Sequence, residues 1–278
     1  MPNPLTTTGI ILNLSLRKWA GEVNDKTALQ AVADTFKSDT HNDKYKKSLF
    51  VNDPLSMVDR CAGRLRNHFY ARTLSWLDGG QGRLIPSKSF RDFANEHTPL
   101  KMQFYQEVDT FIDAYPDHQV LAKERKGDLY HEGEYPSVED LRTRFEVKLI
   151  TLPFPDVEDF RVDAAEDVIE ELQISMKESA EHVQHVLSDE LKLRLAKRLQ
   201  MLHKTLLVGK RFNKSLLTEI QDLVSMSDNL RDSVETNLRD KFIQVKKEIL
   251  IWTPEQIRNS ETIQNDLTHI CYDIIQKL

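Results

Sequence analysis

The stretch between Val162 and Pro254 constrains the fold most, because it contains no proline and only one glycine, Gly209. From residue 168 to 206, apolar side chains recur every three or four positions, with Ser179 in place of one of them, which is the spacing of one face of an α-helix. The pattern predicts a single helix of up to about 40 residues, about 60 Å long, with Gly209 as its C-terminal stop.

A helix of this length is not stable alone in water, so its apolar face must pack against the later helices or against another chain. The part of this face that we assign as the candidate surface for self-association comprises Leu191, Leu195, Leu199, Leu202 and Leu206. Further helical patterns cover 216–224, 230–249 and 257–275, and Thr253 begins a capping box with proline at its first turn. Residues 163–278 are therefore predicted to form a helical domain that contains the long, coiled-coil-like helix.

Residues 1–162 mix two periodicities. Ile10–Leu16 and Phe145–Leu152 alternate between apolar and polar residues, which predicts two strands, and residues 160–162 predict a third short strand. Helical spacing covers the segments 24–36, 55–69, 100–115, 117–127 and 137–144. We therefore expect a mainly α (α+β) protein, in which a small β-sheet lies within a helical N-terminal domain, 1–162, that precedes the helical C-terminal domain.

Composition supports this fold and excludes several others. Only 9 glycines and 10 prolines occur in 278 residues, too few for the frequent turns of a sandwich, barrel or propeller. The 2 cysteines make neither a disulfide framework nor a zinc motif. The first residues lack the charged and apolar regions of a signal peptide, and no apolar run approaches the length of a membrane span. We expect a soluble, cytoplasmic protein that does not bind a membrane.

The net charge of −6 hides a strong local polarity. Residues 155–190 contain twelve acidic and two basic residues, whereas residues 191–214 contain eight basic residues and no acidic one. The basic face has four interpretations: a solvated surface, a phosphate-binding surface, a surface that meets the acidic half of another copy, and a membrane surface. The candidate residues for binding nucleic acid or another anionic partner are Lys192, Arg194, Lys197, Arg198, Lys204, Lys210, Arg211 and Lys214.

No motif indicates an enzyme. Gly79, Gly80 and Gly82 could cradle a phosphate, but no Gly-Lys-Ser/Thr sequence follows them, so a hairpin or a helix-to-strand turn is the preferred interpretation. Glu178, Glu181, His182 and His185 lie within two helical turns, so that one face could offer two imidazoles and a carboxylate, yet no matching second motif is found and a solvated face is preferred to a metal site. We therefore predict no catalytic residue, no metal and no cofactor.

One block of the chain resembles a known group of proteins. The residues that carry the resemblance are Arg72–Trp76, Gly82–Pro86, Phe111–Pro116, Tyr135–Leu141, Arg144–Phe145, Pro153–Pro155 and Asp159–Val162. The block, about residues 50 to 165, resembles a group of uncharacterised proteins of phages and mobile elements, similar to domain-of-unknown-function family 3150. Genes of that group often lie near AAA+ ATPases of the MoxR type and von Willebrand A proteins, so the resemblance implies an accessory or adaptor role and, for a phage protein, the host cytoplasm.

These observations predict a non-enzymatic interaction, scaffold or adaptor protein. It would act through helical self-association as a homo-oligomer, or through a protein partner such as an AAA+ ATPase. The alternative is a nucleic-acid-binding accessory protein of phage replication or recombination that uses the basic helix 191–214.

Overall fold

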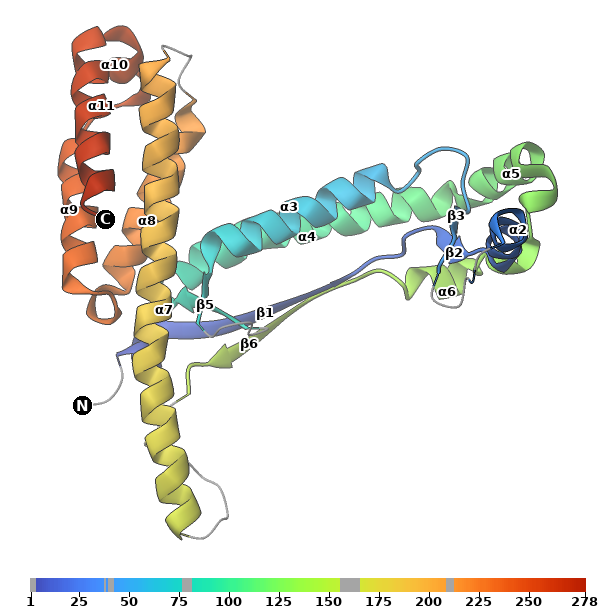
Figure 1. Ribbon diagram of the computed structural model, residues 1–278, viewed down its shortest axis with the longest axis horizontal. Coiled ribbons are helices and arrows are strands. Elements are labelled where there is room, and N and C mark those ends of the chain that lie inside the picture. The colour runs from blue at the N-terminus through green and yellow to red at the C-terminus, as the bar shows by residue number, and fades with distance from the viewer. Residues whose placement is uncertain (1–3, 38, 40–42, 77–81, 156–165, 209–212) are drawn as a thin grey trace. The chain divides into compact units, whose positions relative to one another are not determined.

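The computed structural model describes residues 4–37, 39, 43–76, 82–155, 166–208 and 213–278 (Figure 1). Helices dominate it, as the sequence predicts. The helices are α1 (Leu5–Thr8), α2 (Lys26–Phe36), α3 (Ser56–Arg72), α4 (Phe90–Asp113), α5 (Tyr115–Lys126), α6 (Val138–Arg142), α7 (Glu166–Leu207), α8 (Lys214–Asn229), α9 (Thr236–Glu248), α10 (Pro254–Asn259) and α11 (Glu261–Gln276). The strands are β1 (Gly9–Arg17), β2 (Glu22–Asn24), β3 (Lys46–Ser48), β4 (Leu74–Ser75), β5 (Arg83–Pro86) and β6 (Glu146–Pro153).

A small sheet accompanies these helices, which confirms the predicted fold class. Its strand order is β4-β5-β1-β6, and the two predicted strands are β1 and β6 within a residue or two at each end. β1 pairs antiparallel with β5, with Ile10 opposite Ile85. The pair β2–β3 forms a separate two-stranded sheet that the sequence did not reveal. The third predicted strand, at residues 160–162, lies outside the described residues.

The strands on either side of the glycine-containing segment pair as in a hairpin, which is one of the two preferred interpretations from the sequence. β4 and β5 pair antiparallel on either side of it, and residues 77–81 of the connection lie outside the described residues. Gly82 is needed for close packing, because a Cβ atom there would lie 2.8 Å from Cγ2 of Ile11 and 3.1 Å from Nε1 of Trp76. Close packing therefore explains why a glycine stands at this position, and phosphate binding is not needed to explain it.

The chain divides into two compact units, each assembled from segments far apart in sequence. One unit contains Met1–Asn13, Tyr70–Ala94 and Ile150–Leu278, and the other contains Leu14–Phe69 and Asn95–Leu149. This division differs from the predicted boundary between residues 162 and 163. The reason is packing: Leu5, Ile11 and Leu84 are buried in the same core as the C-terminal helices. We call the two parts the α7 unit and the aromatic unit.

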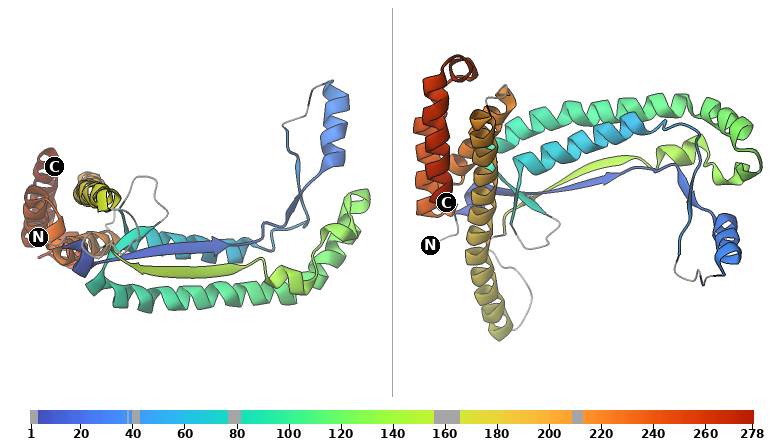
Figure 2. Two further views of the ribbon diagram at one scale, coloured as in Figure 1. Left: turned by 90° about the horizontal axis from the view of Figure 1, so that it is seen from below. Right: turned by 45° about the horizontal axis from the view of Figure 1, so that its top comes forward.

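The α7 unit is built around one very long helix. α7 spans 42 residues, close to the predicted length, and packs against α8, α11 and β4. The predicted capping box is present, because the Thr253 side chain accepts from the backbone of Gln256 and the Gln256 side chain accepts from Thr253 N–H. In Figures 1 and 2 the C-terminal half of α7 lies beside the later helices, and its N-terminal half extends beyond them.

The aromatic unit has its own core. Trp19, Phe50, Phe111 and Tyr115 form a cluster with ring centroids 5.7–6.3 Å apart, mostly edge to face. The predicted apolar face of residues 55–69 is buried, and its members from Leu55 to Leu65 belong to this core, as do the predicted core residues of α4. α2 forms as predicted with Asp25 as its N-cap, but none of its residues is buried and Phe36 is 74 % exposed.

A buried histidine makes the stability of the aromatic unit depend on pH. His97 on α4 is 5 % exposed, and its ring lies 5.9 Å from that of His68 on α3. Burial, then the neighbouring His68 and Lys101, lowers the pKa of His97 to about 4. The unfolded chain therefore binds this proton more readily than the folded chain between pH 4 and 6.5.

We expect the free energy of unfolding to fall by about 3 kcal/mol as the pH falls from 6.5 to 4. Above pH 6.5 the contribution of His97 is fully present. Urea unfolding at a series of pH values checks this, with His97→Leu expected to lose most of the pH dependence. The exposed His269→Leu is the matched control, and equal pH dependence in the two variants would contradict the assignment.

Candidate interaction surface on helix α7

The described side chains in the two halves of α7 differ in their exposure. From Val183 onward a buried residue recurs at every turn, packed against α8 and α11. In the N-terminal half, among the side chains that the structure describes, Val168 is 42 % and Ile174 is 56 % exposed. Among the described side chains of α7, buried core residues thus occur from Val183 onward.

The predicted self-association leucines lie inside this core. Leu191, Leu195, Leu199 and Leu202 are fully buried, and Leu206 is 8 % exposed. They pack within the cluster that also contains residues of α8, α9 and α11. Of the two alternatives that the sequence left open, the later helices cover this stripe, so the leucines are not a surface that a second copy could contact. Self-association itself stays a prediction, and it would have to use other residues.

The predicted basic face is divided by the fold. Lys192, Lys197 and Lys204 are exposed and make no ion pair with any residue that the structure describes. Arg198 pairs with Glu219 on α8, with its Nε 2.9 Å from the carboxylate. The side chain of Arg194 is largely buried. Of the remaining candidates, Lys214 is the exposed first residue of α8, whereas Lys210 and Arg211 lie outside the described residues.

Arg194 caps the C-terminus of α3. Its guanidinium donates to the backbone oxygens of Tyr70 at 2.9 Å, Ala71 at 3.2 Å and Thr73 at 2.8 Å. The last carbonyls of a helix have no partner within the helix and carry partial negative charge, so a guanidinium is well matched to them. This role is structural, and it corrects the assignment of Arg194 to a binding face.

Glu190 holds Arg194 and a second arginine together. Its carboxylate accepts from Arg194, from Arg83 at 2.9 Å and from the backbone N–H of Ser75. Burial by itself would raise the pKa of Glu190, but Arg194, the Ser75 N–H and Arg83 outweigh it and hold the pKa below its usual range. The result is a charged cluster, Arg83–Glu190–Arg194, that ties α7 to the β4–β5 hairpin and to the end of α3.

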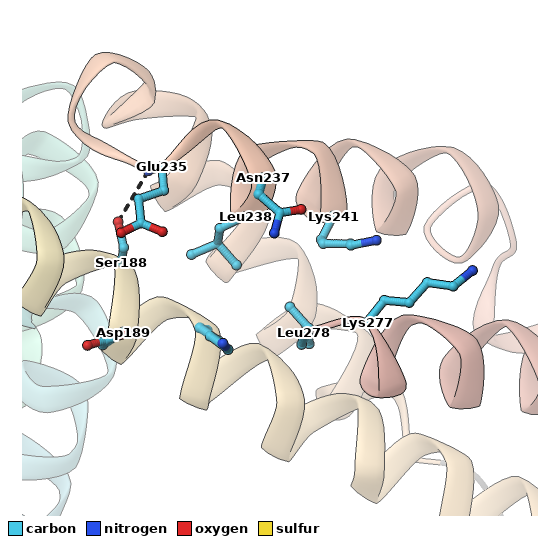
Figure 3. Close-up of a pocket in the computed structure, with 9 residues that line it drawn as sticks. Ser188, Asp189, Glu235, Asn237, Leu238, Lys241, Lys277 and Leu278 are labelled. Carbon is cyan, nitrogen blue, oxygen red and sulfur yellow. Dashed lines mark hydrogen bonds between the residues drawn. The ribbon is translucent and has the colours of Figure 1, made fainter.

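A small pocket lies where α7, α9 and α11 meet (Figure 3). Three lysines line it, Lys192, Lys241 and Lys277, together with Asp189 and Glu235. Glu235 N–H donates to Ser188 Oγ at 3.2 Å, and a Glu235 carboxylate oxygen lies 3.0 Å from His185 Nδ1. The volume is about 60 Å³, enough for a small ion or a few water molecules.

A larger cavity of about 170 Å³ lies between α8 and the segment Arg72–Phe93. Arg72 and Asp222 form an ion pair of 2.8 Å there, and Asn229 donates to Ser89 Oγ at 3.0 Å. Two of the charged groups in its lining, Arg72 and Asp222, are thus engaged with one another. Among the residues that the structure describes, no group of three or more histidine, cysteine or acidic side chains could hold a metal ion, and no helix is long and apolar enough to cross a membrane.

The surface that sequence reasoning missed is the side of α7 that faces away from the leucines. Exposed residues recur there every three or four positions along the whole helix, and we call this set the outer stripe. It comprises Val168, Glu171, Ser175, Glu178, His182, His185, Asp189, Leu193, Lys197, Gln200, Lys204 and Leu207. Leu193 and Leu207 are 70 % and 63 % exposed. A search for a second periodic stripe in the same helix could have found it.

The chain matches no family model, no curated protein and no solved structure. The resemblance to domain-of-unknown-function family 3150 therefore stays a prediction, and the outer stripe has to be interpreted from its own chemistry.

Proposed function

We propose that this chain is a non-enzymatic interaction protein, a scaffold or adaptor, whose docking surface is the outer stripe of α7. The supporting observation is that the N-terminal half of α7 is helical although Val168 and Ile174 are about half exposed there. Helices in proteins gain most of their stability from packing an apolar face, and intrinsic propensity contributes little. A helical partner that covers the outer stripe would supply this packing.

Nucleic acid is the competing partner, because Lys192, Lys197 and Lys204 are exposed. Two features argue against it. Arg194 and Arg198 are engaged within the chain, which removes two of the cations in the middle of the basic segment. The outer stripe also carries exposed carboxylates, among them Glu171 and Glu178, that repel phosphate groups. A protein surface with both signs of charge fits this pattern better.

Site-specific photocrosslinking in cells that produce the full chain tests the proposal. A photoreactive amino acid replaces Ser175 on the outer stripe, and the matched control replaces the exposed Lys247 on α9. We expect a discrete protein crosslink from position 175 and none from position 247. Equal crosslinking at the two positions, no crosslink at all, or a crosslink from 175 to nucleic acid would contradict the proposed function.

A further inference from the structure

We infer that the outer stripe of α7 binds a second copy of this chain, with the two α7 helices antiparallel. The inference rests on the proposed function and names the partner. Its basis is that the stripe is complementary to itself when it is reversed. Two acidic members, Glu171 and Glu178, and two basic members, Lys197 and Lys204, lie in opposite halves of the helix at matching distances from its middle, while Asp189 lies near the middle itself.

One register makes this complementarity concrete. Placing Glu171 of one copy opposite Lys204 of the other also places Glu178 opposite Lys197. Because the arrangement has two-fold symmetry, each of these ion pairs occurs twice. All four side chains are exposed, and none makes an ion pair with a described residue of its own chain.

Two further pairs of stripe positions agree with the same register, whereas His182 meets Leu193 and the central His185 and Asp189 meet no stripe residue. Val168 and Leu207, which are 42 % and 63 % exposed, lie opposite each other at the two ends of the contact. Ser175 lies opposite Gln200, so that a polar residue meets a polar residue. Towards the two ends of the contact, a single register thus pairs Val168 with Leu207, Ser175 with Gln200, and two glutamates with two lysines.

The spacing of the stripe suits helix pairing. Its steps are of three and four residues, close to the repeat of 3.5 that keeps one face of a helix against a partner in a coiled coil. A parallel pair in which each residue lies opposite its own copy would instead place glutamate opposite glutamate and lysine opposite lysine, which is unfavourable. Charge therefore selects the antiparallel orientation.

The test uses sedimentation equilibrium of the purified full chain at about 50 mM salt, where ion pairs are least screened. Two charge-reversed variants are prepared, Lys197→Glu with Lys204→Glu, and Glu171→Lys with Glu178→Lys. We expect the unaltered chain to dimerise and each variant alone to have a dissociation constant raised by about 100-fold, because four attractive pairs become repulsive. Mixing the two variants restores all four pairs, so the mixture is expected to dimerise again.

The matched control is Lys247→Glu with Lys123→Glu, which makes the same change in net charge at exposed positions on α9 and α5. It is expected to dimerise like the unaltered chain. Recovery in the mixture also shows that the variants are folded, and far-ultraviolet circular dichroism of each variant checks this independently. A chain that is monomeric at all concentrations, or a dimer that neither variant weakens, would overturn the inference. If the purified chain is monomeric but position 175 crosslinks to a different protein in cells, the proposed function stands and this inference fails.

Discussion

Replacing Glu190 by alanine is expected to lower the free energy of unfolding by about 3–5 kcal/mol. The carboxylate is the shared partner of Arg83 and Arg194, whose side chains are only 13 % and 21 % exposed. Its removal leaves two arginines close together and without their counter-charge, and it removes the acceptor of the Ser75 N–H. Urea unfolding at pH 7 measures the loss.

Asp189→Ala is the matched control for this variant, because Asp189 is the adjacent acid, is exposed and makes no ion pair with a described residue. Surface substitutions of this kind usually change the free energy of unfolding by no more than about 0.5 kcal/mol. If Glu190→Ala lost no more stability than Asp189→Ala, the charged cluster would not be the link between α7 and the β4–β5 hairpin that the geometry indicates.

A second large effect separates the two faces of α7. Leu199→Ala is expected to lower the free energy of unfolding by about 2–5 kcal/mol, since this side chain is fully buried and its truncation leaves a cavity. Leu193→Ala, six residues earlier on the same helix, is 70 % exposed and is expected to cost less than about 0.5 kcal/mol. The measurement is urea unfolding at a protein concentration low enough to keep the copies apart.

In an experiment that measures association between copies, the order of the two variants should be reversed, with the larger effect from Leu193→Ala. Leu193 belongs to the outer stripe, so its truncation is expected to weaken association, whereas a folded fraction of Leu199→Ala should associate normally. Comparable losses of stability in both variants would mean that α7 does not have one inner and one outer face.

Much of the fold could be predicted because its signals are local. The apolar spacing from residue 168 onward, the capping box at Thr253 and the alternation in β1 each depend on residues adjacent in sequence. The short strands β2 and β3 were missed, since three residues are too few to establish a period. The division into units was also out of reach, because it depends on Leu5 and Leu84 meeting helices far along the chain.

The site was harder to predict for a related reason. In the sequence, Arg194 does not differ from the other cations of the basic helix. Only its hydrogen bonds to backbone oxygens at the end of α3 show that its guanidinium is already occupied within the chain. The leucines looked suitable for self-association because the sequence does not say whether the later helices or another chain cover them. From Leu187 to Leu199 the buried residues are four apart, which is more than the 3.6 residues of one helical turn. The buried face therefore rotates around α7 along this stretch. For this reason the position of the outer stripe is not obvious from the spacing of the apolar residues.

Distances between spin labels test the central claim most directly, namely that α7 pairs with α7 of a second copy in an antiparallel register. Labels are attached through a cysteine at Asp189 or at Gln200. The native Cys61 and Cys271 stay in place, because both are buried and burial raises the pKa of each thiol. In the inferred register the two labels at position 189 are offset by about 5 Å along the helix axis, and those at position 200 by about 37 Å. A short distance at position 189 with a long one at position 200 is the predicted result. Short distances at both positions, or no coupling between copies at either, would contradict it.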